Sequence, residues 1–167
     1  RRTKRRIEDV SFTALHRADA VGYSALHLLR HLLRGDMLPY HAYELARMLH
    51  NTADDDPFWL EWTELHDPSL RKLEAICFAL AHQWFAGQLP AAAREEIGRL
   101  PAETARWLNV YGGSPLEGLF RPNKNELWLH WSLAESQGAR FAILRRRLLP
   151  ALPPGPADAV HVPEPEL

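Results

Sequence analysis

The sequence predicts an all-α protein, an irregular helical bundle of about six to eight helices with a Pro-rich, extended C-terminal tail. Apolar residues recur at helical spacing in almost every segment before Pro150, and no run alternates apolar and polar residues for long enough to predict a sheet. The composition then changes, because six of the last 18 residues are prolines. We therefore divide the chain into a basic N-terminal segment (1–10), a helical domain (11–150) and a Pro-rich tail (151–167).

Composition bounds the class of protein. A chain of 167 residues, 46% hydrophobic and 25% charged, fits one globular domain with a real core. The net charge of −1 gives no overall field for nucleic acid, which is therefore not an expected partner. Without an apolar stretch of membrane-spanning length or a visible signal peptide, we expect no membrane partner and a cytoplasmic protein. The single cysteine, Cys77, lies in an apolar run and is expected to be buried.

The first segment, "RRTKRR", holds five basic residues in six. A nucleic-acid-binding arm, a solvated segment and the cut edge of a longer chain are all compatible with such a run. We interpret it as the cut edge.

Two helices follow. Asp19 is expected to cap a helix from about Ala20 to Arg34, which Gly35 ends. Its apolar side comprises Val21, Ala25, Leu28, Leu29 and Leu32. The next helix contains "YHAYELARMLH", with a broad apolar stripe of Tyr40, Tyr43, Leu45, Met48 and Leu49.

Asp-Pro pairs predict the next two helix starts, with Asp56 and Asp67 as caps. The second of these helices runs to Gly87 and is the expected centre of the bundle. "PAAAREEIGRL" and "PAETARWLNVYGG" predict two more helices, "SPLEGLFRPNK" a loop, and "NELWLHWSLAESQG" and "ARFAILRRRLLP" the last helices. Tryptophans spaced three apart within these segments predict core faces rather than a stacking platform; they are Trp59 with Trp62, and Trp128 with Trp131.

"LHLLRHLLRGD" places His27 and His31 four residues apart on one helix face. His-x3-His can chelate zinc or another first-row metal if a third ligand arrives from a neighbouring element, and a short turn could fold His41 and Glu44 back. The residues between the histidines are Leu, Leu and Arg, so the glutamate of the zinc-protease motif is missing. We therefore favour a polar cleft lined by His27, His31, Arg34, His41 and Glu44, with no metal and no catalytic residue.

Asp54 and Asp56 have the D-x-D spacing that can hold Mg²⁺ against a triphosphate. The Gly-Ser turn and the strand that accompany this pair in nucleotide-transferring enzymes are not seen here, and Asp56 is expected as a helix cap. We interpret the pair as structural.

Five segments, in order, carry a resemblance to a known family: "SALHLLRHLLRGD", "YHAYELARMLH", "DDDPFWLEWTELH", "LRKLEAICFALAHQWF" and "LFRPNKNELWLHWSL…LRRRLLP". Together, over about residues 7 to 152, they resemble the C-terminal helical half of an uncharacterised bacterial nucleotidyltransferase-like family. In that family the helices follow a polymerase-β-type core that carries the metal-binding carboxylates. No part of the core's motif matches this sequence.

The resemblance implies a helical, substrate-side portion of a nucleotidyltransferase-like protein, not catalytically competent alone. Its partners would be the missing core or an unknown acceptor substrate. Mg²⁺ and a nucleoside triphosphate would belong to that core, so no cofactor is expected in this chain. His27, His31 and Glu44 match recurring polar positions of the family and are expected on the acceptor side.

Two other functions stay open from the residues. One is a free-standing helical module that binds a protein or a small ligand in a groove between helices. The other is a metal-dependent helical hydrolase that uses the histidines.

Overall fold

The computed structural model describes residues 1–149 and confirms the predicted all-α class, because helices dominate and the only sheet of these residues has two strands. The elements in chain order are β1 (Arg2–Ile7), β2 (Val10–Leu15), α1 (Arg17–Arg34), α2 (Pro39–Asn51), α3 (Asp56–Leu65), α4 (Pro68–Phe85), α5 (Ala91–Gly98), α6 (Ala102–Tyr111), α7 (Ser114–Glu117), α8 (Glu126–Leu133) and α9 (Gln137–Leu148).

The chain forms two compact units, Arg1–Leu133 and Ala134–Leu167. The described part of the second unit contains α9, and the predicted tail at 151–167 lies outside the described residues. Among residues 1–149 no helix has the length and apolar character needed to cross a membrane.

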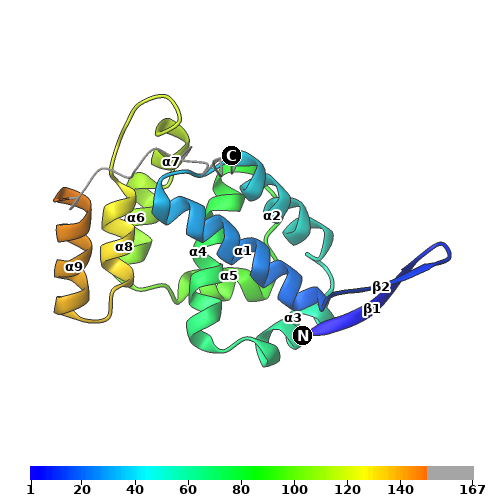
Figure 1. Ribbon diagram of the computed structural model, residues 1–167. Coiled ribbons are helices and arrows are strands. Elements are labelled where there is room, and N and C mark those ends of the chain that lie inside the picture. Colours follow the sequence, from blue (N-terminus) through cyan, green and yellow to red (C-terminus); the bar gives the residue numbers. More distant parts are fainter. Residues whose placement is uncertain (150–167) are drawn as a thin grey trace, which may run out of the picture. The chain divides into compact units, whose positions relative to one another are not determined.

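Helix α4 forms the centre of this unit, as its apolar sequence predicts. It packs against α1, α2, α5 and α6, and Figure 1 shows α1 crossing it. Six apolar residues of α4 have no exposed surface: Ala75, Ile76, Cys77, Phe78, Leu80 and Ala81. Helices packed on several sides of α4 explain why it is apolar almost all round.

The predicted apolar side of α1 is confirmed, since Val21, Ala25, Leu28, Leu29 and Leu32 are all buried. The predicted start is wrong. The helix begins at Arg17 with His16 at the N-cap, and Asp19 lies inside the first turn. Its carboxylate binds Arg1 and His66 instead of capping the helix.

The caps of α3 and α4 follow the Asp-Pro signals with one shift. Asp67 caps α4 as predicted, accepting from the backbone N–H groups of Ser69 and Leu70 at 2.8 and 3.0 Å. On α3 the cap is Asp55, which accepts from Phe58 N–H at 3.1 Å, while Asp56 is the first helical residue. Three aspartates in a row offer alternative caps, and the structure uses the middle one.

The aromatic predictions are confirmed in part. Trp59, Trp62 and Trp107 are buried, whereas Trp128 is 51% exposed. Tyr40 and Tyr43 are 60% and 44% exposed, so the apolar stripe of α2 is narrower than predicted and is formed by Leu45 and Leu49 with half-buried Met48. The amphipathic side chain of tyrosine tolerates this position at the edge of the stripe.

The two-stranded sheet was not expected from the sequence. β1 and β2 pair antiparallel from Arg2↔Leu15 to Ile7↔Val10, across a two-residue turn in which Glu8 has φ 52°. Figure 1 shows this hairpin extending away from the helices. Directly paired residues share a face, so one face carries Thr3, Arg5, Ile7, Val10, Phe12 and Ala14 and the other carries Arg2, Lys4, Arg6, Ser11, Thr13 and Leu15.

Candidate functional site

The site begins at the turn that ends α1. Gly35 adopts the left-handed conformation (φ 75°), and its N–H donates to Leu32 O at 3.1 Å while Asp36 N–H donates to His31 O at 3.2 Å. These two bonds are the Schellman arrangement for which glycine is the preferred residue. The turn returns the chain onto the last turn of α1 and places Asp36 beside His31.

Three imidazoles meet across α1 and α2. His27 and His31 lie one turn apart on α1, and His41 comes from the first turn of α2, which packs against α1. The ring centroids of His27 and His41 are 4.6 Å apart, as are those of His27 and His31, and those of His31 and His41 are 5.1 Å apart. One nitrogen from each ring lies within 4.8 Å of the other two. We call these three residues the histidine cluster.

The cluster sits at the edge of the core, and each of its residues is partly buried. Burial lowers the pKa of His41, and the neighbouring His27 and His31 lower it further, whereas Glu44 acts in the opposite direction. A neutral imidazole has a lone pair that can bind a metal ion. The environment of His41 therefore favours its ligand form.

Asp36 supports His31 from outside the cluster. Nδ1 of His31 lies 2.9 Å from Oδ1 of Asp36, so with the proton on Nδ1 the ring keeps Nε2 free. A carboxylate that holds the far nitrogen of a histidine is the usual outer partner of a metal ligand. Tyr23 stacks on His27 with a centroid distance of 5.9 Å.

Of the predicted cleft residues, His27, His31 and His41 come together. Glu44 lies one turn after His41 on α2, is exposed, and accepts a hydrogen bond from Tyr40 Oη at 2.7 Å. This hydrogen bond to Glu44 raises the pKa of Tyr40. Arg34, in the last turn of α1, is exposed and does not join the cluster.

Asp54 and Asp56 do not form a carboxylate pair for a metal ion. Asp54 accepts a 3.3 Å hydrogen bond from Gln88, and Asp56 begins α3. The structural interpretation of this D-x-D pair agrees with these positions.

A second polar group, which sequence reasoning missed, lies inside the core. His66, at the end of α3, is 2% exposed and has its Nδ1 2.8 Å from Glu74 of α4, while its Nε2 faces Asp19 of α1 at 3.4 Å. Trp62 Nε1–H donates to Glu74 at 2.9 Å. Because Glu74 has no exposed surface, this group has no access to a substrate, and it serves to join α1, α3 and α4.

No protein-family model, curated protein or solved structure matches this chain.

Proposed function

We propose that this chain binds one first-row transition metal ion, with zinc as the best fit, through His27, His31 and His41. The observation that carries the proposal is the convergence of three imidazoles from two helices, with a nitrogen of each within 4.8 Å of the others. Tetrahedral zinc with Zn–N bonds of about 2.1 Å needs nitrogens about 3.4 Å apart. Metal binding would therefore require the three imidazoles to move closer together.

The chemistry of the donors favours this class of metal. Three neutral imidazoles suit Zn²⁺, Co²⁺, Ni²⁺ and Cu²⁺, whereas Mg²⁺ and Ca²⁺ prefer oxygen ligands. Asp36 supplies the outer carboxylate on His31. Because the protein offers three ligands at its surface, a fourth position stays open to water or to a ligand, as in exchangeable and catalytic sites.

The test is metal binding by untagged protein. We expect one Co²⁺ per chain with the visible absorption of a tetrahedral site, displaced by Zn²⁺ in titration calorimetry. His27→Ala, His31→Ala and His41→Ala should each weaken binding by more than about 100-fold, and Asp36→Asn by about 10- to 100-fold.

His50→Ala is the matched control, because His50 lies on α2 but is exposed and outside the cluster. It should bind metal as the parent does. Failure of the parent to take up one equivalent of metal, or equal loss in His50→Ala, contradicts the proposal.

As a second candidate, we propose that the chain is the substrate-side helical portion of a bacterial, cytoplasmic nucleotidyltransferase-like protein. Exposed apolar side chains on one face of the hairpin favour it: Ile7 and Val10 are 64% and 66% exposed, and a two-stranded sheet alone is marginally stable in water. In this reading a core sheet covers that face, the core holds Mg²⁺ and the nucleotide, and His27, His31, Arg34, His41 and Glu44 face the acceptor.

The gene sequence upstream of the codon for Arg1 tests this second candidate. Coding sequence in frame before Arg1 should contain a Gly-Ser-x-Asp-x-Asp segment. Its absence removes the candidate and leaves metal binding untouched.

A further inference from the structure

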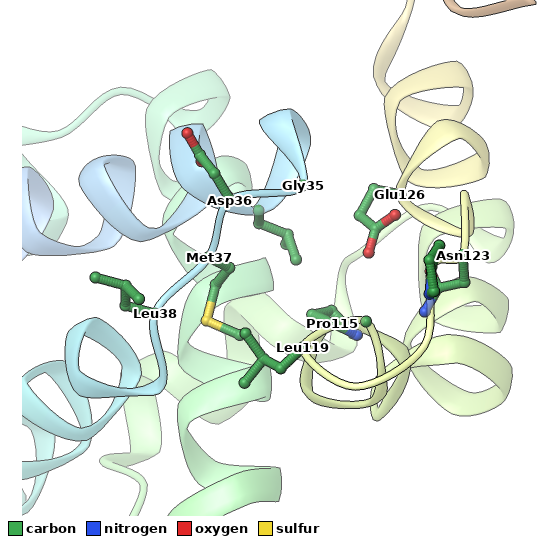
Figure 2. Close-up of a pocket in the computed structure, with 11 residues that line it drawn as sticks. Gly35, Asp36, Met37, Leu38, Pro115, Leu119, Asn123 and Glu126 are labelled. Carbon is green, nitrogen blue, oxygen red and sulfur yellow. The ribbon is translucent and has the colours of Figure 1, made fainter.

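A cavity of about 440 Å³ lies between the end of α1 with the turn after it and the segment from α7 to the start of α8. Figure 2 shows Met37 and Leu38 on one side and Pro115, Leu119 and Asn123 on the other. Leu32 and Pro122 complete a lining of mixed polar and apolar character. This size and lining are typical of small-molecule sites.

One charged group is aimed into this cavity. Glu126 is 8% exposed, and Figure 2 shows its carboxylate pointing into the space between Pro115 and Asp36. Within residues 1–149 it makes no hydrogen bond or ion pair through its side chain, and no lysine, arginine or histidine lines the cavity.

The other deeply buried glutamates of the described chain are compensated. Glu74 meets His66 and Trp62, and Glu96 is bound by Arg71 and Arg99, each at 2.9 Å. The Glu126 side chain, by contrast, lines the cavity and has no such partner there. Glu126 lies in the first turn of α8, where the helix dipole favours a negative charge. Its carboxylate oxygens point into the cavity, where they can accept hydrogen bonds from a ligand.

The other polar side chains around the cavity are already engaged. Asn123 donates to Ser114 O at 2.9 Å and accepts from Asn125 N–H at 3.3 Å, which holds the loop together. Asp36 is held by His31. Glu126 is thus the polar group left to recognise a ligand.

We propose that this cavity binds a small alkylammonium ligand, with the ammonium group on Glu126 and the aliphatic body against Leu38 and Leu119, the exposed apolar side chains of its lining. A carboxylate only accepts hydrogen bonds, so it favours a cationic donor, and the apolar side chains of the lining offer a surface to a hydrocarbon body. The cavity shares Asp36 with the surroundings of the histidine cluster, but its binding chemistry is independent of any metal.

The experiment uses n-hexylamine, which is a cation at neutral pH, with hexanol and hexanoate as probes of equal length. Calorimetry of metal-free protein should show saturable binding of hexylammonium, weaker binding of hexanol and none of hexanoate. Glu126→Gln should weaken hexylammonium binding by about tenfold or more and leave hexanol unchanged.

Glu117→Gln is the matched control, because it removes the same charge from an exposed position on α7 outside the cavity. Thermal unfolding gives a second measurement, since hexylammonium should raise the melting temperature of the parent and of Glu117→Gln but not of Glu126→Gln. Absence of saturable binding, equal affinity in Glu126→Gln, or equal loss in Glu117→Gln overturns the proposal.

Discussion

Gly22 lies where α1 passes directly over the buried ion pair of the core. A Cβ at this position would meet Glu74 Oε1 at 2.4 Å and His66 Cε1 at 2.8 Å. Both neighbours are buried and hydrogen-bonded to each other, so neither can withdraw without breaking that pair. Glycine is required here by a close approach rather than by backbone conformation.

Gly22→Ala should therefore destabilise the protein by about 1–3 kcal/mol, despite the higher helix propensity of alanine. The measurement is chemical denaturation followed by far-ultraviolet circular dichroism. Gly98→Ala is the control, because a Cβ at Gly98 meets nothing within 4 Å, and its stability should match or exceed that of the parent. Equal effects of the two substitutions would refute the role assigned to Gly22.

His66 makes the stability of the fold depend on pH. Burial lowers its pKa, but the hydrogen bonds and charges of Glu74 and Asp19 outweigh burial and raise the pKa of His66 above its ordinary value of 6.5. Arg1 on Asp19 and Arg71 on the His66 carbonyl are the cations that face this group. A raised pKa in the folded state means that protonated His66 stabilises the fold fully below pH 6.5 and that this contribution is lost as pH rises through the folded pKa.

We expect the free energy of unfolding to fall as pH rises from below 6.5 through the raised pKa of His66, and His66→Gln to remove most of this slope. Comparing denaturation curves of the two proteins over that range isolates His66 from the other histidines. A parallel pH profile in His66→Gln would exclude His66 as the source.

At the scale of elements, the starts of α3 and α4 differ in how far the local sequence determines them. One cap can be read from the sequence, whereas the other depends on packing against a distant residue. Asp67 before Pro68 is a single unambiguous cap. At α3, three successive aspartates all satisfy the capping preference, and Arg17 of α1 pairs with Asp55, which decides between them. That choice depends on a residue 38 positions away, which a local pattern does not contain.

Asp67→Ala should cost about 1 kcal/mol through loss of the α4 cap. Asp55→Ala should also lower the denaturation midpoint clearly, because both the α3 cap and the pair with Arg17 are lost, while Asp56→Ala should change it little. An Asp56→Ala effect as large as that of Asp55→Ala would show that Asp56 is the true cap.

The histidine cluster shows the same limit of prediction. Helical spacing alone places His27 and His31 on one face, and Gly35 correctly marks the turn that follows. The position of His41 depends on the direction in which α2 leaves that turn. Met37, which lies between the turn and α2, is 3% exposed, and its burial in the core fixes that direction. The group around His66 was beyond prediction, because its members come from three helices and show no common spacing.

At the scale of the whole molecule, the hairpin is the part that sequence patterns missed. β1 has no apolar–polar alternation, since its alternate positions are Arg, Lys and Arg against Thr, Arg and Ile, and the Glu-Asp turn lacks the glycine or asparagine typical of tight hairpins. The helical core could be predicted, because the apolar residues of α4 and of one side of α1 are recognisable from the sequence alone.

Since both hairpin faces are largely exposed, the helices should fold without them. A chain that begins at His16 should keep its helical circular dichroism and unfold cooperatively, with a modest loss of stability from the missing Arg1–Asp19 pair. Loss of cooperative unfolding in this shortened chain would mean that the hairpin is part of the folding unit.

The reaction of Cys77 with a thiol reagent can report how fast the helical core opens. It is the sole thiol of the 167 residues, it has no exposed surface, and burial raises its pKa, so its sulfur reacts with a thiol reagent only when α4 separates from its neighbours. At high reagent concentration, the labelling rate equals the rate of that separation. Metal bound at the histidine cluster would tie α1 to α2 and should slow this labelling, and an amine bound at Glu126 would act at the same C-terminal end of α1.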